Sequence, residues 1–300
     1  MTKERFRFNS EVNELPHPKD FVVLPKIDII FKKFFSAESN INLLKDLISS
    51  ALVVSPDSIE DLQIMNSSLF PKHLNEKFCH VDLMLQLDGK IIDIEMQVHN
   101  TGEYRNLSVY YGAGAYFGTI DKGDGYQNPD QVIVLSFLAY DEFPLSEGYK
   151  SQFGLLELTR HELLTDKLQF IYFEINKIPE TTDERIGLWL RFLKAETQAE
   201  LDEIIKIGDN IMAQAVSTIR QMDEDNLFRE KARERRLSMA DERFALSHAF
   251  TEGERKGEIK GKIEGKAIGA HENAIETAKK MLQRNFPVDS IKEMTNLDTA

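Results

Sequence analysis

Two acidic residues face each other in a predicted β-hairpin. Alternating apolar and polar segments at residues 78–87 and 90–98 are joined by Asp88-Gly89, a dipeptide typical of two-residue hairpin turns. With these two residues in the turn, the register of the strands places Asp82 directly opposite Glu95. The sequence therefore predicts two carboxylates at one place on one face of a sheet.

Like charges at opposed positions repel each other, and a bound cation relieves that repulsion. Carboxylate oxygens are hard ligands that suit Mg²⁺ or Mn²⁺, so Asp82 and Glu95 are candidate ligands of a divalent ion. The same register places Asp93 opposite Met84 on the face that carries both acids. The other face of the hairpin is continuously apolar, as a core face should be. The alternative is an exposed polar strand face on which the acids are simply hydrated.

The elements around the hairpin predict an α/β core in residues 1–180. Apolar residues recur at helical spacing in residues 24–35 and 41–52, before the hairpin, and a second helical run follows it at residues 102–119. Strands are predicted at residues 132–139, 153–158 and 168–176. Gly112 and Gly114 in the second helical run favour close helix packing over a phosphate loop, because no strand directly precedes them.

A helical region is predicted at residues 181–250, followed by a tail at residues 251–300. Within the tail, glycine recurs every four residues from Gly253 to Gly269 among Glu and Lys. Since each Gly weakens a helix, we expect a solvated, partly helical tether that ends in a short helical module. The alternative is a seam through which the C-terminal region forms a homo-oligomer.

Composition restricts the class of protein and its partners. The 300 residues include 37 Lys+Arg, 50 Asp+Glu, one Cys and 42% hydrophobic residues, with a net charge of −13. Disorder, collagen and a disulfide-stapled scaffold are excluded. No apolar run is long enough to span a membrane, so we expect a cytoplasmic protein without a membrane partner.

The negative charge repels nucleic acid, so a polynucleotide partner requires bound metal ions or local basic clusters. One such cluster comprises Arg229, Lys231, Arg233, Arg235 and Arg236. It is either a solvated helix face with i,i+4 ion pairs or a stripe that contacts phosphates. The histidines lack zinc-site spacing, and neither a GxxxxGK[ST] phosphate loop nor a GxSxG elbow occurs.

The hairpin motif resembles a known nuclease signature. Asp82, followed after twelve residues by Glu95-Met96-Gln97, resembles the PD-(D/E)XK motif, in which the last position is ordinarily Lys. The segment LPKIDIIFK at residues 24–32, and Arg105 with Tyr110 after the hairpin, are similar to the Rpn family of recombination-promoting nucleases and transposases. That family also tends to end in a Glu/Lys/Gly-repetitive tail.

The resemblance implies a restriction-endonuclease-like core, a mixed sheet flanked by helices, followed by a helical C-terminal region. It implies a metal-dependent DNA endonuclease that hydrolyses phosphodiester bonds, related to recombination or transposition, with Mg²⁺ or possibly Mn²⁺ as cofactor and DNA as partner. Asp82, Glu95 and the backbone carbonyl of Met96 would hold the metal, and Asp28 would complete the acidic pocket.

The remaining site residues carry alternatives. Gln97 stands where a catalytic Lys is usual, so either Lys32 supplies the missing charge from the first helix or activity is weak. Lys32 and Asp28 could equally form an i,i+4 surface pair. Arg105 is either a phosphate ligand or a solvated side chain, and Tyr110 is expected to pack against the sheet. The competing function is a catalytically degenerate nuclease fold that binds DNA or another protein.

Overall fold

The computed structural model describes residues 22–65, 68–69, 79–120, 126 and 129–297. Within these ranges, the helices are α1 (Asp28–Ser36), α2 (Ile41–Leu52), α3 (Tyr104–Phe117), α4 (Arg185–Lys194), α5 (Gln198–Lys206), α6 (Asn210–Glu224), α7 (Asn226–Gln283) and α8 (Val288–Thr295). The strands are β1 (Leu62–Met65), β2 (Ser68–Leu69), β3 (Cys79–His80), β4 (Leu83–Leu87), β5 (Lys90–Gln97), β6 (Gln131–Leu138), β7 (Lys150–Leu156) and β8 (Leu163–Glu174).

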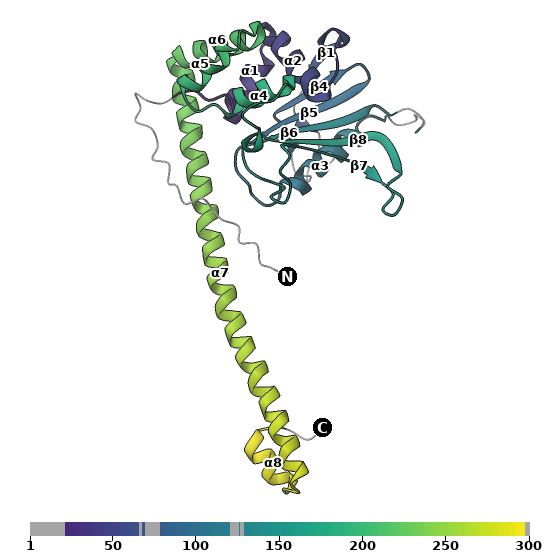
Figure 1. The fold of residues 1–300 in the computed structure, drawn as a ribbon, viewed down its shortest axis with the longest axis vertical. Coiled ribbons are helices and arrows are strands. Elements are labelled where there is room, and N and C mark those ends of the chain that lie inside the picture. Colours follow the sequence, from purple (N-terminus) through teal and green to yellow (C-terminus); the bar gives the residue numbers. More distant parts are fainter. Residues whose placement is uncertain (1–21, 66–67, 70–78, 121–125, 127–128, 298–300) are drawn as a thin grey trace. The chain divides into compact units, whose positions relative to one another are not determined.

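Six of the strands form one mixed sheet, in the order β1-β4-β5-β6-β8-β7 (Figure 1). β5, β6 and β8 are parallel and form the centre, whereas the pairs β1/β4, β4/β5 and β7/β8 are antiparallel. α3 connects β5 to β6, as a parallel pair requires a crossover. β2 and β3 form a separate two-stranded ladder.

The β4–β5 hairpin turns at Asp88 and Gly89, as predicted. Both residues have positive φ, 45° and 70°, which is the combination that a type I′ turn needs and that Asp-Gly tolerates. The predicted register is confirmed from Leu83, opposite Ile94, to Leu87, opposite Lys90. The first strand is shorter than predicted, because β4 begins at Leu83 and Asp82 lies in a bend just before it.

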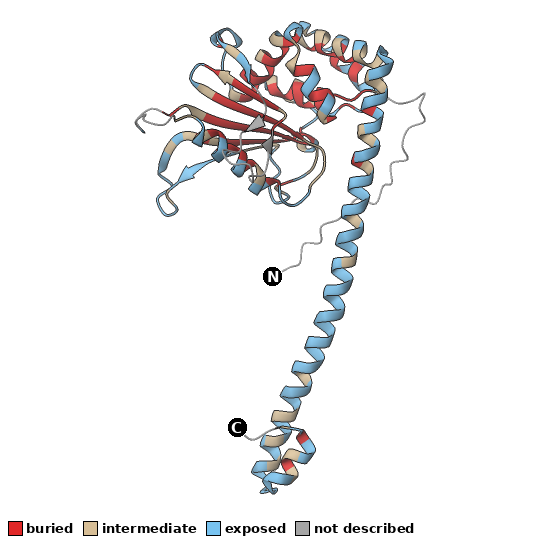
Figure 2. Ribbon diagram, turned by 180° about the vertical axis from the view of Figure 1, so that it is seen from behind, coloured by how far each residue is buried: buried red, intermediate tan, exposed pale blue. Residues whose placement is uncertain are grey.

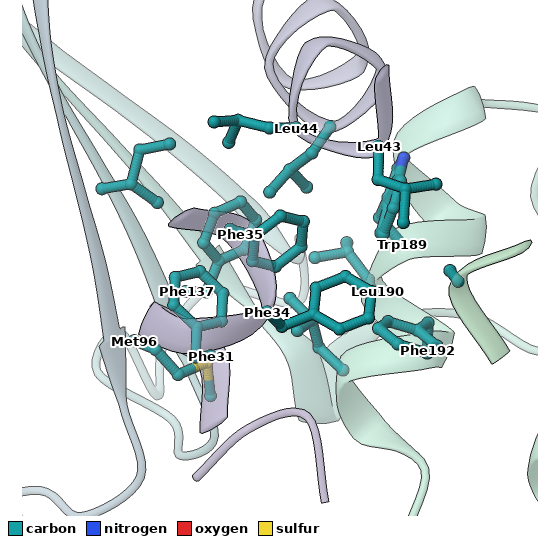
Figure 3. Close-up of a cluster of buried hydrophobic side chains, with 14 of the residues drawn as sticks. Phe31, Phe34, Phe35, Leu43, Leu44, Met96, Phe137, Trp189, Leu190 and Phe192 are labelled. Carbon is teal, nitrogen blue, oxygen red and sulfur yellow. The ribbon is translucent and has the colours of Figure 1, made fainter. Parts of the chain in front are cut away.

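Two hydrophobic clusters lie on the two faces of the sheet, so both faces are buried (Figure 2). On one face, Ile92, Ile94 and Met96 of β5 pack with the aromatic side chains of α1 and α4. Figure 3 shows this cluster, in which the rings of Phe35 and Trp189 lie 5.7 Å apart. Alternation along β5 therefore points Asp93 and Glu95 to the other face.

α3 covers the face of the sheet that carries the acids. Its buried residues include Tyr104, Ser108 and Tyr111, which belong with Val134 and Phe170 to the second cluster. Tyr104 donates to Oγ of Ser136 on β6 at 2.8 Å. The face of the hairpin that bears the acids is therefore beneath a helix and not open to solvent.

The glycines of α3 separate into two kinds. A Cβ on Gly112 would lie 2.8 Å from the ring of Phe170 and 3.0 Å from Val134, so close packing of the helix on the sheet requires a glycine there. A Cβ on Gly114 would meet nothing within 4 Å. Tyr110 is 54% exposed, so the expectation that it packs against the sheet is wrong: it projects from the solvent side of α3.

The helices α4, α5 and α6 complete the first cluster and do not form a core of their own. Ile186, Leu190, Ile204 and Val216 belong to the same buried set as α1, α2 and β5. Arg185 at the start of α4 lies 3.0 Å from Asp46 of α2, which also accepts the indole N–H of Trp189 over 2.7 Å. The core and the helical region are therefore joined by apolar and charged contacts.

The chain divides into two compact units, one formed by Glu11–Ala240 and the other containing Asp241–Ala300. α7 runs through the boundary, and its glycine repeat is helical throughout, not partly helical as expected. The repeat is solvent-exposed and carries i,i+4 ion pairs such as Lys262 with Glu258. α8 matches the predicted terminal helical module. None of the described helices combines the length and apolar character needed to cross a bilayer.

Candidate active site

Asp82 and Glu95 lie together where the β4–β5 ladder ends. The backbone N–H of Asp82 donates to Oε1 of Glu95 at 3.1 Å, and the N–H of Met96 donates to Oδ2 of Asp82 at 2.9 Å. The bend before Leu83 ends the strand pairing one position early and turns the Asp82 amide toward Glu95. Each carboxylate is thus oriented by the backbone of the other strand.

Glu95 is buried and Asp82 is half-buried, so the alternative of a hydrated polar strand face is wrong. Glu95 is only 2% exposed. Burial raises the pKa of Asp82 to about 6, which the Met96 amide opposes and the Asp28 carboxylate reinforces. Burial also raises the pKa of Glu95, and the nearby carboxylates of Asp93 and Asp82 add to that effect. The site concentrates negative charge where water is scarce.

Asp93 is a third acid in this region, to which the sequence analysis gave a position but no role. It lies opposite Met84 as predicted and is 0% exposed. Neither of its carboxylate oxygens has a hydrogen-bond partner among the described residues. Burial, followed by the charge of Asp82, raises its pKa well above the ordinary value. A buried carboxyl group in this state favours the neutral form or a cation nearby.

Gln97 and Met96 contact the acidic pair directly. Nε2 of Gln97 donates to Oε2 of Glu95 at 3.1 Å, so the residue at the usual lysine position orients Glu95 without adding charge. The Met96 side chain lies in the first cluster, as Figure 3 shows, and its backbone N–H donates to Asp82. The structure therefore brings four of the predicted residues together on consecutive segments of one hairpin.

α1 contributes charge to the same place. Asp28 raises the pKa of Asp82, and Lys32 and Arg235 lower it, so all three side chains are close enough to act on this carboxylate. Asp28 forms an ion pair with Arg235 of α7, with Nη2 and Oδ2 2.7 Å apart. α1 is held in position by Phe31, Phe34 and Phe35, which are fully buried.

Arg105 is engaged elsewhere. Its Nε lies 2.6 Å from Oε1 of Glu142, its Nη2 donates to the Glu142 carbonyl, and its guanidinium stacks 4.6 Å from the ring centroid of Phe143. The buried Glu174 adjoins this group, since Phe143 donates to it at 3.0 Å. Arg105 thus anchors the loop after β6 to α3, and its side chain is still 56% exposed.

The donors of the acidic pair fit a hard divalent cation. Asp82 and Glu95 provide carboxylate oxygens held by the hairpin. Their pKa values are raised by burial first and by neighbouring carboxylates second, and a cation would favour the charged form of both acids. Mg²⁺ is usually bound by one or two carboxylates and keeps several waters. Among the residues that the structure describes, no group of three or more His, Cys, Asp or Glu is arranged so that it could hold a metal ion.

A mixed sheet flanked by helices, with an acid before one central strand and Glu-x-Gln within the next, defines a PD-(D/E)XK, restriction-endonuclease-like core. Residues 25–249, three quarters of the chain, match the family model of the PD-(D/E)XK nuclease family transposase. The chain belongs to this family, as the motifs at residues 24–32 and 82–97 led us to expect. Neither a curated protein nor a solved structure matches the chain.

Sequence reasoning missed two members of the site. Asp93 was recognisable, because it shares a strand face with Glu95 two residues away. Arg235 was seen only as part of a basic cluster on a helix, and nothing local connects it with Asp28, which is 207 residues earlier. A pairing of this kind depends on how α7 packs against α1.

Proposed function

We propose that this protein is a Mg²⁺-dependent DNA endonuclease, with Mn²⁺ as a possible substitute, acting in recombination or transposition in the cytoplasm. Membership of the PD-(D/E)XK nuclease transposase family supports a nuclease-related role. The single observation that carries the proposal further is the Asp82–Glu95 pair, in which each acid is fixed by the backbone next to the other.

In this proposal Asp82, Glu95 and the Met96 carbonyl hold the metal, and Asp28 completes the acidic pocket. A bound divalent ion lowers the pKa of a water molecule and neutralises charge on the attacked phosphate. Gln97 keeps Glu95 in orientation through its amide. Lys32, whose charge acts on Asp82, takes the place of the lysine that the motif usually supplies at position 97.

Arg105 is proposed as a contact for a phosphate of the DNA backbone. Its exposed guanidinium surface supports this role, although Glu142 occupies part of its hydrogen-bonding capacity. If Arg105 contacts one phosphate, Arg105→Ala reduces the slope of log affinity against log salt by about one. An unchanged slope in a folded Arg105→Ala variant would remove this residue from the proposal.

The decisive experiment incubates the purified full-length chain with supercoiled plasmid in Mg²⁺, Mn²⁺, Ca²⁺ or EDTA. Asp82→Asn and Glu95→Gln keep the size of each side chain and are expected to abolish nicking. Asp88→Asn is the matched control, because it removes one acid from the turn of the same hairpin at a position where Asn also tolerates positive φ. Cleavage in EDTA, or cleavage that survives both site substitutions, contradicts the proposal.

The second candidate is a nuclease fold that binds DNA or protein without cutting. Gln97 favours it, since a neutral amide contacts Glu95 where a cation is usual. DNA retention that weakens with salt, together with no nicking in any divalent ion, would establish this alternative.

Self-association through the C-terminal region is a separate proposal. The exposed glycines of α7, beside which a Cβ would meet nothing within 4 Å, leave room for a second helix. The solution mass of the full chain, compared with that of a chain ending at residue 250, tests it. An unchanged oligomeric state excludes the tail from this role.

A further inference from the structure

The ion pair between Arg235 and Asp28 joins α7 to α1 at the edge of the candidate site. Nε of Arg235 lies 3.0 Å from Oδ1 and 2.8 Å from Oδ2 of Asp28, and Nη2 lies 2.7 Å from Oδ2. The side chains are 31% and 27% exposed, so the pair is partly shielded from water. Both oxygens of Asp28 are thereby held by one guanidinium group.

The packing of α7 determines where Arg235 points. Ala232 and Met239, three residues before and four after it, are 0% and 8% exposed and belong to the cluster that contains α1. Residues at these spacings share one face of a helix. The apolar contacts therefore hold this stretch of α7 in the same cluster as α1 and direct Arg235 toward Asp28.

We propose that Arg235 is a positioning residue of the candidate active site: it holds the Asp28 carboxylate beside Asp82 and makes this part of α7 a functional part of the site. The proposal rests on the proposed function, because it concerns the orientation of a metal-site acid. The planar guanidinium suits this task, since it binds both oxygens of a carboxylate at once, which a lysine ammonium does not reproduce.

A purely structural ion pair is the competing explanation, and the two make different predictions. A structural pair affects the stability of the fold and leaves the affinity for the metal unchanged. A positioning residue affects metal affinity, and does so only while Asp28 is present to be positioned. Partners of metal-binding groups typically change affinity by about 10–100-fold.

The test titrates Mn²⁺ into the full-length chain without DNA and follows binding by calorimetry. Arg235→Gln is expected to weaken Mn²⁺ binding by about tenfold, and Arg235→Lys to restore part of the loss. Adding Arg235→Gln to Asp28→Asn is expected to cause no further loss. Arg233→Gln is the matched control, because Arg233 lies on the same helix two residues earlier and is exposed.

Each outcome decides the proposal. The proposal is overturned if a folded Arg235→Gln variant binds Mn²⁺ as tightly as the wild type. It is also overturned if Arg235→Gln weakens Mn²⁺ binding equally with and without Asp28. In either case the proposed function stands. Absence of Mn²⁺ binding to the wild-type chain overturns both. Circular dichroism establishes whether each variant is folded. If Arg235→Gln unfolds, Arg235→Lys replaces it. The Mn²⁺ affinity of Arg235→Lys is then compared with that of the wild type, once with Asp28 present and once with Asp28→Asn.

Discussion

Asp82 and Glu95 are joined through the main chain, since the Asp82 amide donates to Oε1 of Glu95 over 3.1 Å. The carboxylate of Asp82 in turn accepts the amide that follows Glu95. This reciprocal arrangement keeps two acids close together although Glu95 is buried and Asp82 is half-buried. The orientation of either acid consequently depends on the other, and substitutions at the two positions should not have additive effects on cation binding.

Cation binding should depend on pH through Asp82, whose pKa is raised to about 6. The metal binds the deprotonated carboxylate, so Mn²⁺ affinity should increase as the pH rises through the pKa of Asp82. If binding of the metal displaces one proton, the increase in Mn²⁺ affinity approaches tenfold per pH unit below the pKa. Calorimetric titrations at a series of pH values measure it, and an affinity that does not vary with pH contradicts the prediction.

Asp93 should make the metal-free protein less stable as the pH rises. Its pKa is higher in the folded than in the unfolded chain, so between those two values the folded chain binds more protons. The free energy of unfolding therefore falls as the pH increases through this window, which begins near the ordinary pKa of Asp.

Asp93→Asn removes this contribution and should flatten the pH dependence of stability. Urea unfolding in EDTA between pH 4.5 and 8 gives the slope of the unfolding free energy against pH. Slopes are compared, and not absolute stabilities, because the new amide also has unpaired polar atoms. Asp88→Asn controls for the loss of one acid at an exposed position. Parallel curves for wild type and Asp93→Asn would remove Asp93 as a source of the pH dependence.

Substitutions of Gln97 should separate orientation of Glu95 from charge. Gln97→Met keeps the size of the side chain but removes the donor at 3.1 Å from Oε2, and a loss of nicking rate of about tenfold is expected. Gln97→Lys places a cation beside Glu95, which should lower the pKa of that acid and shift the pH–rate profile toward acid. The profile is measured with supercoiled plasmid in Mg²⁺. Wild-type rates in Gln97→Met would show that the hydrogen bond is dispensable.

Two glycines of one helix should respond oppositely to the same substitution. Gly112→Ala places a methyl group 2.8 Å from the ring of Phe170 and should cost about 1–3 kcal/mol of unfolding free energy. Gly114→Ala meets no atom within 4 Å and should stabilise α3 by up to about 1 kcal/mol. Urea denaturation of both variants measures the difference. Equal effects would mean that α3 does not pack on the sheet as described.

Local patterns were sufficient for the hairpin and for most of the elements around it. Asp88-Gly89 determined the turn because few other residues tolerate positive φ at both positions. The turn then determined the register, in which Leu83 lies opposite Ile94. Alternation then placed Asp93 and Glu95 on one face. The family motifs extended this prediction to the fold class and to the acidic pair.

Other features depend on contacts between distant segments. Gly112 allows the close approach of α3 to Phe170 on the acid-bearing face of the sheet. Burial on this face raises the pKa of Glu95. Tyr110 was assigned to the wrong face, since the period of α3 alone did not indicate which side meets the sheet. The site roles and the domain boundaries proposed at residues 180 and 250 stay predictions.

The sequence by itself determined the hairpin turn and which acids share one strand face, because turn type and strand alternation are set by interactions within a few residues. Tertiary structure decided that Asp93 and Glu95 are buried, that Asp82 lies in a bend and not in the ladder, and that Arg235 reaches Asp28 across 207 positions. Burial and long-range ion pairs depend on how helices pack against a sheet. That packing is the sum of many weak apolar contacts, which no short segment specifies.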